Sequence, residues 1–336
     1  MGKEKQPVFI VSSERSGTNL LRRRLSESQS AYYGPAPLHL LKHFFYREQA
    51  YGDLGDDRNF VALVRDCLGL AYAHFSPWDE DISVDEVIAE YDHLATSCGR
   101  SAIGLMHVIN TIYARRKGYD SYICKDNNLF DYVYPIAMGI PGAKFIFLYR
   151  DARDVVVSQL KRPTQIKSVL YLSTLWKDEQ EKIIQAMGFP PLEKRSFSIS
   201  YEDYVTDEKK HLKSMCDFLN VEMVSSKEGA RHSSEKADIQ EWENLNKPTM
   251  KNNFGKYSES LSQKQITMVE SIAKRQMLRL GYRPEYAVRN KSQYQVKAII
   301  FMAKVWRLIK NKLGLLSKTK GQSDRERYIA SLDRMT

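Results

Sequence analysis

The sequence predicts an α/β fold with a mostly parallel sheet flanked by helices. Short apolar runs alternate with segments of helical periodicity along the chain, which is typical of a parallel sheet covered on both faces. The first apolar run leads directly into a polar loop and then a helix. The 336 residues, 43% of them hydrophobic and 27% charged, are enough for a substantial core and exclude a disordered or fibrous chain.

The elements follow in order along the chain. Residues 7–11 form the first predicted strand, 12–19 a loop and 20–25 the start of a helix. Residues 44–120 are predicted to be mostly helical because apolar side chains recur there at three- and four-residue spacing, with an acidic break at 79–85. The remaining predicted strands are 121–124, 143–149 and 197–200, with helices at 130–138 and after 150.

The composition changes once, after about residue 287, so we expect a domain over residues 1–287 and a helical extension over 288–336. Of the net charge of +10, nine units come from residues 289–320, which contain no acidic residue. Their apolar side chains keep helical spacing, which predicts a C-terminal basic amphipathic helix. Three roles stay open for it: packing on the domain or a partner subunit, lying on an anionic membrane surface, or binding a polyanionic acceptor.

The charge distribution argues against a nucleic-acid partner, because only about one unit of positive charge remains for the domain. The four cysteines have no pairing rhythm, and the N-terminal apolar run is too short for a signal peptide. The longest apolar run near the C-terminus, 298–303, is too short to span a membrane. These features predict a cytoplasmic protein, with peripheral membrane contact as the alternative.

The segment Ser12–Leu21 places a glycine, two hydroxyls and an arginine between a strand and a helix. The amides at a helix N-terminus favour an anion, and an arginine adds a forked cation for phosphate or sulfate oxygens. The segment is therefore P-loop-like, although it lacks the leading glycine and the lysine of a Walker A loop. An ordinary helix cap is the alternative. The predicted anion-binding residues are Arg15, Ser16, Gly17, Thr18 and Asn19.

A second segment places Arg150 at the carboxyl end of a predicted strand, where ligands bind in open parallel sheets. Ser158 and Arg162 follow eight and twelve residues later. If a helix begins near Asp151, they lie on one of its faces and converge with Arg150 on a single anion. Arg153 and Asp154 are predicted to form a capping and salt-bridge cluster instead.

The two segments resemble the phosphosulfate-binding elements of sulfotransferases that use 3′-phosphoadenosine 5′-phosphosulfate (PAPS). The first resembles the loop that holds the 5′-phosphosulfate, and the second resembles the strand and helix that hold the 3′-phosphate. Within this superfamily the sequence is most similar to the tyrosylprotein sulfotransferase branch, from about Val8 to Tyr282. The resemblance implies PAPS as co-substrate and a hydroxyl-bearing acceptor.

Further positions support the resemblance. Lys125 lies 25 residues before Arg150, as the family's Lys-Asp segment does, and Arg162 falls on its second arginine. Tyr201 begins a Tyr-Glu-Asp motif whose tyrosine, in the family, helps bind the nucleotide. Lys247 and Lys256 lie in a segment that resembles a late loop closing over the nucleotide. The resemblance therefore assigns Tyr201, Lys247 and Lys256 to PAPS binding.

Sulfuryl transfer requires cations where charge builds on the bridging and sulfuryl oxygens. Arg15 and Lys125 are the candidates, because of their residue type, their strand-end placement and the resemblance. No metal is expected, because the sequence shows no cluster of Asp, Glu or His with ligand spacing.

A general base must also take the acceptor's proton. The tyrosylprotein branch has a catalytic glutamate twenty residues after the loop arginine, followed by two arginines that grip acidic peptides. Here Pro35, Pro37 and Leu41 occupy these positions. His39, which follows a Pro-rich turn, is the predicted base; a packed or surface histidine is the equal alternative. The fallback bases are His43, His107 and Glu48.

The lost arginines leave the acceptor open among carbohydrate, lipid-linked, small-molecule and tyrosyl hydroxyls. Aromatic residues at 32–33 and 44–46 are either acceptor-pocket or core residues. Two other functions compete with sulfotransfer. One is an ATP-dependent kinase with a degenerate P-loop, which the missing Walker lysine disfavours. The other is a basic membrane- or nucleic-acid-binding module without catalysis.

Overall fold

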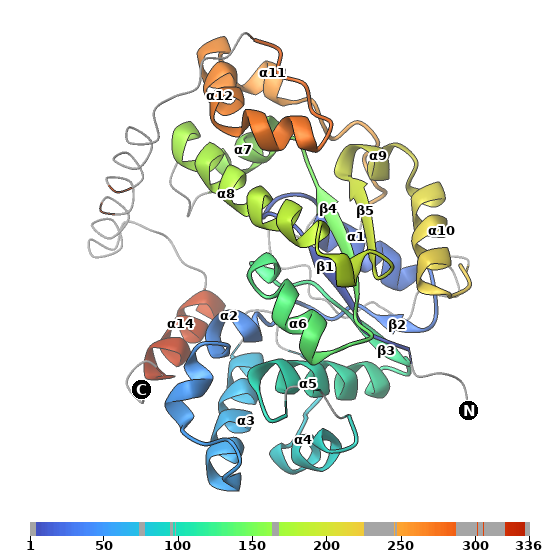
Figure 1. Cartoon of the computed structure of the whole chain (residues 1–336), viewed down its shortest axis with the longest axis vertical. Coiled ribbons are helices and arrows are strands. Elements are labelled where there is room, and N and C mark those ends of the chain that lie inside the picture. Colours follow the sequence, from blue (N-terminus) through green and yellow to red (C-terminus); the bar gives the residue numbers. More distant parts are fainter. Residues whose placement is uncertain are drawn as a thin grey trace.

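A five-stranded parallel sheet with strand order β2-β3-β1-β4-β5 forms the centre of the computed structural model (Figure 1). The strands are β1 (Val8–Val11), β2 (Tyr32–Tyr33), β3 (Ser121–Cys124), β4 (Lys144–Tyr149) and β5 (Ser196–Ser200). The structure describes residues 5–73, 78–94, 97, 99–162, 168–224, 245, 247–286, 301, 305 and 320–332. Because the strands are parallel, the residues that follow them meet at one edge of the sheet.

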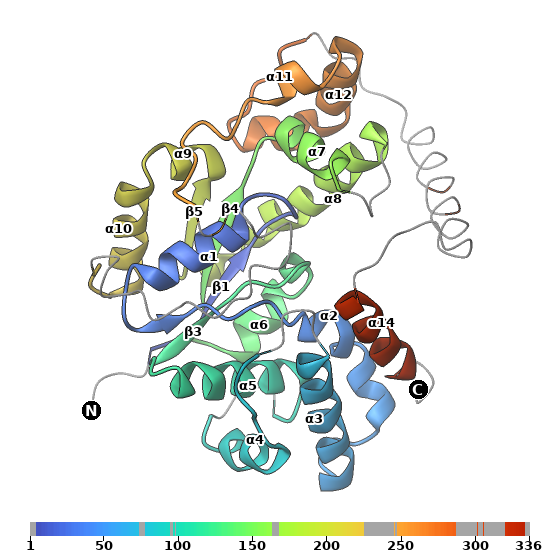
Figure 2. The same ribbon diagram turned by 180° about the vertical axis from the view of Figure 1, so that it is seen from behind.

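Helices cover both faces of this sheet (Figure 2). Val8 and Ile10 of β1 face a core that is closed by α1 (Thr18–Glu27), α9 (Tyr201–Thr206) and α10 (Glu208–Leu219). Phe9 and Val11 point to the opposite core, which is closed by α5 (Ala102–Arg116) and α6 (Val133–Gly139). This alternation is the two-residue period of a pleated strand buried on both sides, as the sequence predicts.

The segment between β2 and β3 is mostly helical, as predicted. It contains α2 (Leu40–Phe44), the 3₁₀ helix η1 (Arg47–Tyr51), α3 (Asp57–Tyr72), α4 (Val84–Tyr91) and α5. Side chains of Asp56, Ser83 and Ser101 accept backbone amide hydrogen bonds at the starts of α3, α4 and α5. Such caps satisfy amides that have no partner within the helix. The predicted helix at 130–138 is divided into the short η2 (Leu129–Asp131) and α6.

A third core lies beyond β4, between α7 (Ala152–Leu160), α8 (Val169–Met187) and α12 (Gln263–Arg279). The short elements η3 (Pro190–Leu192) and α11 (Tyr257–Ser260) connect these layers to the rest of the chain. Arg153 is buried here and pairs with Asp151 at 2.7 Å and with Glu270 at 2.8 Å. The predicted structural role of Arg153 in a salt-bridge cluster is therefore confirmed.

The last described helix is α14 (Lys320–Leu332), which packs on α3, an element from the N-terminal part of the chain (Figure 1). The predicted basic amphipathic helix over 289–320 lies outside the described residues, except for Phe301, Val305 and Lys320. Within the described ranges, no helix combines the length and the apolar character needed to cross a membrane.

Candidate active site

The loop between β1 and α1 lies at the carboxyl edge of the sheet and has two residues in the left-handed region, Arg15 (φ 68°) and Gly17 (φ 88°). The ring of Tyr201 packs against Gly17 so closely that a Cβ added to this glycine would lie 2.5 Å from the ring. Glycine at position 17 is therefore required by both backbone conformation and contact.

Side chains hold this loop in place from within. The hydroxyls of Ser13 and Ser16 are 3.0 Å apart, and Gln180 of α8 donates to Ser13 Oγ at 3.0 Å. The hydroxyl of Ser16, which was predicted to bind an anion, is thus buried and hydrogen-bonded to Ser13 within the loop. No side chain caps the start of α1, and the buried Asn19 Oδ1 has no partner among the described residues. The first amides of α1, at Thr18 and Asn19, begin the helix N-terminus predicted to bind an anion.

Arg150, at the end of β4, is buried and reaches across the sheet edge to the loop. Its Nη1 donates to the carbonyl of Arg15 at 3.2 Å, and its Nη2 donates to the carbonyl of Asn253 at 2.8 Å. Its guanidinium lies 4.2 Å from the centre of the Tyr201 ring. Arg150 Nε is buried without a partner among the described residues. The structure thus brings Arg150, Tyr201 and the loop together.

Ser158 and Arg162 follow Arg150 but bind different groups. Ser158 Oγ accepts from Arg15 Nε at 3.1 Å, which joins the two predicted anion-binding segments. Arg162 Nη1 instead donates to Glu14 Oε2 at 2.7 Å. The prediction that Arg162 shares a helix face with Ser158 is wrong, because α7 ends at Leu160.

Lys125, which follows β3, joins a second group of side chains at the same edge. Its Nζ donates to Asn127 Oδ1 at 2.7 Å, and Asn127 Nδ2 donates to Glu14 Oε1 at 2.9 Å. Burial lowers the pKa of Lys125 to about 8, against the opposing effect of the negative charges of Glu14 and Asp126. A lysine whose charge has lost its water is a strong electrostatic partner for an anion.

His39 lies beside this group but does not fit the predicted role of general base. Its Nδ1 accepts the backbone amide of Asn127 at 3.0 Å and lies 3.5 Å from Asp126 Oδ1. An amide N–H can only donate, so the neutral ring carries its own proton on Nε2. In this geometry His39 presents a hydrogen-bond donor rather than a proton acceptor.

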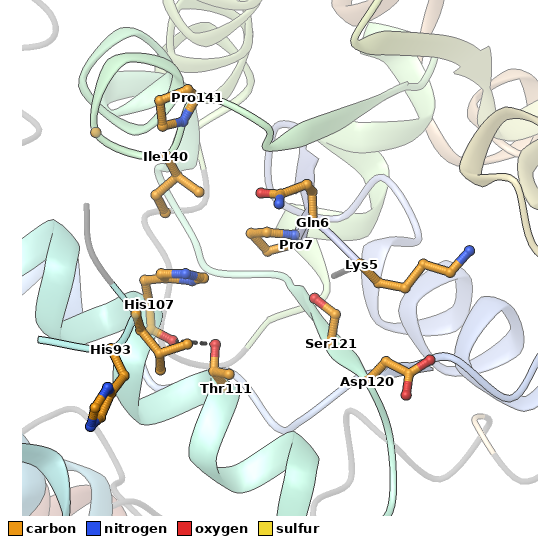
Figure 3. A pocket seen from close by; sticks show the side chains of 12 residues that line it. Lys5, Gln6, Pro7, His93, His107, Thr111, Asp120, Ser121, Ile140 and Pro141 are labelled. Atoms are coloured by element: carbon orange, nitrogen blue, oxygen red, sulfur yellow. Dashed lines mark hydrogen bonds between the residues drawn. The ribbon is translucent and has the colours of Figure 1, made fainter. Parts of the chain in front are cut away.

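The other candidate bases, His43, Glu48 and His107, have a lowered pKa or form hydrogen bonds away from this group of side chains. Burial, followed by nearby cations led by Arg325, lowers the pKa of His43 to about 4. Glu48 accepts the amide of Ala102 at 2.6 Å and so caps α5. His107 bonds the Tyr122 hydroxyl at 3.0 Å and lines a cavity of about 170 Å³ with Lys5, Pro7 and Ser121 (Figure 3). These neighbours begin β1 and β3, so the cavity lies at the opposite edge of the sheet.

The predicted late loop packs beside Arg150 and Tyr201 through Asn253. Asp154 accepts the amides of Gly255 and Tyr257 at 2.6 and 3.2 Å, which anchors the loop. Lys256 Nζ donates to Asn253 Oδ1 at 2.7 Å, and Asn253 Nδ2 donates to the Tyr201 hydroxyl at 2.9 Å. The carbonyl of Lys247 accepts from Arg24 at 2.6 Å. Asp154 therefore anchors the late loop, and among the described residues it forms no ion pair of the predicted salt-bridge cluster.

Of the predicted aromatic residues, Tyr32, Tyr33 and Phe44 are core residues, whereas Tyr46 is exposed. Two carboxylates at the site were not predicted. Glu14 connects Asn127 to Arg162. Burial and the charges of Glu14 and Asp131 raise the pKa of Glu179, on α8, to about 8. The only sequence feature that could have indicated a site role for Glu14 is its position directly before the loop arginine, Arg15. Among the described residues, no group of three or more Cys, His, Asp or Glu side chains is arranged to hold a metal ion.

Comparisons with known proteins identify the fold and the family of the chain. A search of curated proteins finds no match. Two solved structures share the fold. The sulfotransferase domain of the Synechococcus PCC 7002 olefin synthase has a TM-score of 0.52 at 21% identity, covering 81% of this chain and 96% of that domain. The sulfotransferase domain from the curacin biosynthetic pathway has a TM-score of 0.55 at 19% identity, covering 83% and 98%. A sulfotransferase family model matches residues 7–225, so the chain belongs to the sulfotransferase family.

Proposed function

We propose that this protein transfers the sulfuryl group of PAPS to an acceptor hydroxyl and releases 3′-phosphoadenosine 5′-phosphate. The observation that carries the proposal is the hydrogen bond between Arg15 and Ser158, two residues 143 positions apart. It joins the loop after β1 to the helix after β4, the two segments that resemble the phosphosulfate and 3′-phosphate elements of PAPS enzymes.

The groups at this edge fit such a nucleotide. Arg150 offers a buried Nε without a partner in the described part of the chain, and α1 begins without a side-chain cap. Arg15, Arg150 and Ser158 would hold phosphate oxygens, while Tyr201 and the late loop with Lys247 and Lys256 would enclose the nucleotide. When bound, PAPS supplies an activated sulfuryl group on a phosphate leaving group.

The second group of side chains would act on the acceptor half of the reaction. Lys125, protonated below about pH 8, would neutralise charge that builds on the transferring oxygens. The Nε2–H of His39 would donate to an oxygen of the acceptor or of the transferring group at the same edge of the sheet. Arg162 is held by Glu14 and is positioned to exchange this partner for an anion.

We assign proton acceptance to Glu14, because its carboxylate connects the nucleotide loop to the Lys125–Asn127 pair. Replacing Glu14 by glutamine is expected to lower kcat roughly 10²- to 10⁴-fold, since the amide keeps the size of the side chain but cannot take a proton. Steady-state kinetics measure this, with Glu27→Gln on α1 as the control. An unchanged kcat in Glu14→Gln would assign the base to another group, such as Glu179.

The acceptor class is inferred from two arginines of the tyrosylprotein branch that this sequence lacks. The positions of the two peptide-gripping arginines of the tyrosylprotein branch hold Pro37 and Leu41. A carbohydrate, lipid-linked or small-molecule hydroxyl is therefore at least as well suited as a tyrosyl hydroxyl. The test is to incubate the protein with sulfur-labelled PAPS and fractionated acceptor extracts. We expect label in one acceptor fraction with wild-type protein and none with Lys125→Ala; label in no fraction would contradict sulfotransfer.

A further inference from the structure

The backbone at His39 adopts a strained conformation, which requires stabilising contacts from the surrounding residues. His39 has a φ of 60°, in the left-handed region that a residue with a Cβ adopts only at a cost of about 1 kcal/mol or more. Such a conformation persists where the surroundings determine it from several sides. The Leu38–His39 peptide has such contacts on two sides, with Asp126 and with Arg325.

Two opposite charges hold it from opposite directions. The buried side chain of Asp126, just after β3, lies on one side, with its Oδ1 3.5 Å from His39 Nδ1. Burial raises the pKa of this carboxyl, whereas the backbone amides of His39 and Leu38 favour its charged form. On the other side, Nη2 of Arg325 donates to the carbonyl of Leu38 at 2.7 Å. Asp126 thus lies beside the N–H groups and the ring of this dipeptide, and Arg325 binds its C=O group. The hydrogen bond from Arg325 is charge-assisted and so belongs to the stronger class in proteins.

Arg325 belongs to α14, 287 positions away from Leu38 and outside the family match over residues 7–225. Only 8% of Arg325 is exposed. Burial lowers its pKa to about 10, so the guanidinium stays charged at neutral pH, and the charge of Asp126 supports it. A buried cation that contacts a backbone carbonyl beside the site has a cost in desolvation that a purely structural helix could avoid with an apolar side chain.

The docking of α14 is specific. The Tyr328 hydroxyl donates to the carbonyl of Asp66 at 3.1 Å. Tyr328 lies against Gly69 of α3, where a Cβ would overlap the tyrosine hydroxyl. Leu332, one turn further on, is 2% exposed. Gly69 thus gives α14 the close approach that lets Arg325 reach Leu38.

We propose that Arg325 is a positioning residue of the acceptor site: with Asp126 it clamps the Leu38–His39 peptide, so that His39 keeps Nδ1 on the Asn127 amide and its proton on Nε2. Its relevance to turnover rests on the proposed sulfotransfer, but the clamp itself does not. By this assignment α14 is a part of the acceptor site contributed by the end of the chain.

The first test observes the histidine directly in the full-length protein. Nitrogen NMR of the histidine side chains reports the tautomer of each ring, and His39→Gln identifies the signal of His39. We expect the Nε2–H form in the wild type and a mixture of tautomers in Arg325→Met. Arg325→Lys should restore the wild-type form in part. The matched control is Arg327→Met on the same helix, because Arg327 is exposed and, among the described residues, forms an ion pair only with Asp324.

The second test separates the acceptor site from nucleotide binding. Arg325→Met should lower kcat for the acceptor by up to about 10²-fold, because a misplacement of about 1 Å at the site can have an effect of this size. The Kd for 3′,5′-ADP should not change. Gly69→Ala should produce the same effects by displacing Tyr328, although alanine favours a helix more than glycine does. Gly188→Ala, where the nearest atoms lie 3.6 Å from an added Cβ, is its control.

The outcomes are distinct. Folded Arg325→Met with the wild-type His39 tautomer and unchanged kcat would overturn the proposal, and so would equal losses in Arg327→Met. If Arg325→Met does not fold, the His39 tautomer and the kcat of Gly69→Ala test the proposal in its place. If the wild type transfers no sulfuryl group, the proposed function fails, while the NMR test still decides on the clamp.

Discussion

Replacing Lys125 by alanine is expected to lower the rate of sulfuryl transfer roughly 10²- to 10³-fold, the usual effect of removing one preorganised charge-stabilising donor. Lys125 follows β3 and is held by Asn127 at 2.7 Å, so its ammonium is already oriented before a ligand binds. The affinity for 3′,5′-ADP should change little, because the side chains that join the two anion-binding segments are Arg15, Arg150 and Ser158.

The measurement combines single-turnover kinetics with calorimetry on the same preparation. Lys177→Ala, which removes a lysine paired with Asp178 on α8, is the matched control and should behave as wild type. A Lys125→Ala protein that transfers sulfuryl at the wild-type rate would remove Lys125 from the reaction.

The pH dependence provides a second check on Lys125. Because burial lowers its pKa to about 8, the ammonium loses its proton as the pH rises through 8 in the free protein. The value of kcat/KM should therefore fall above about pH 8, since this quantity reports groups of the free enzyme. In Lys125→Arg the guanidinium stays charged at this pH, so the basic limb should move upward even if kcat is lower.

Replacing Arg150 by methionine is expected to weaken binding of 3′,5′-ADP roughly 10²- to 10³-fold, since truncating one partner of a buried, hydrogen-bonded charge pair has effects of this size. Arg150 is buried beneath the Tyr201 ring and bonds the carbonyls of Arg15 and Asn253. Its loss removes a cation from the site and also frees the loop and the late segment from each other.

Calorimetric titration of Arg150→Met with 3′,5′-ADP measures this effect, and thermal unfolding shows whether the fold survives. Arg150→Lys should fall between wild type and Arg150→Met, because lysine keeps the charge but not the planar fork. Arg283→Met, at an exposed position, is the control. Wild-type affinity in a folded Arg150→Met protein would contradict the placement of the 3′-phosphate beside β4.

Much of the sheet could be predicted because its strands are buried on both faces. The apolar runs at 8–11, 121–124 and 144–149 have no other stable environment in a chain of this composition. Arg15, Lys125 and Arg150 could be proposed from sequence for a related reason. Each follows a strand, and parallel strands bring their ends to one edge. The fold shared with solved sulfotransferase domains agrees with the predicted parallel sheet.

The remaining features depend on backbone geometry that no local pattern encodes. The left-handed conformation of Arg15 accompanies a loop that directs Glu14 to Arg162 and Asn127. The tautomer of His39 depends on an amide 88 positions away. The contact between Arg325 and Leu38 spans almost the whole chain. Helical periodicity can predict that α14 exists, but it cannot predict which surface α14 covers.

The most direct test of PAPS-dependent sulfotransfer is calorimetric titration of the full-length wild-type protein with 3′,5′-ADP and, separately, with ATP in the presence and absence of magnesium. The arrangement of Arg15, Ser158 and Arg150 predicts tight binding of 3′,5′-ADP without magnesium and much weaker binding of ATP. Tight, magnesium-dependent binding of ATP with no binding of 3′,5′-ADP would contradict this function and favour a kinase.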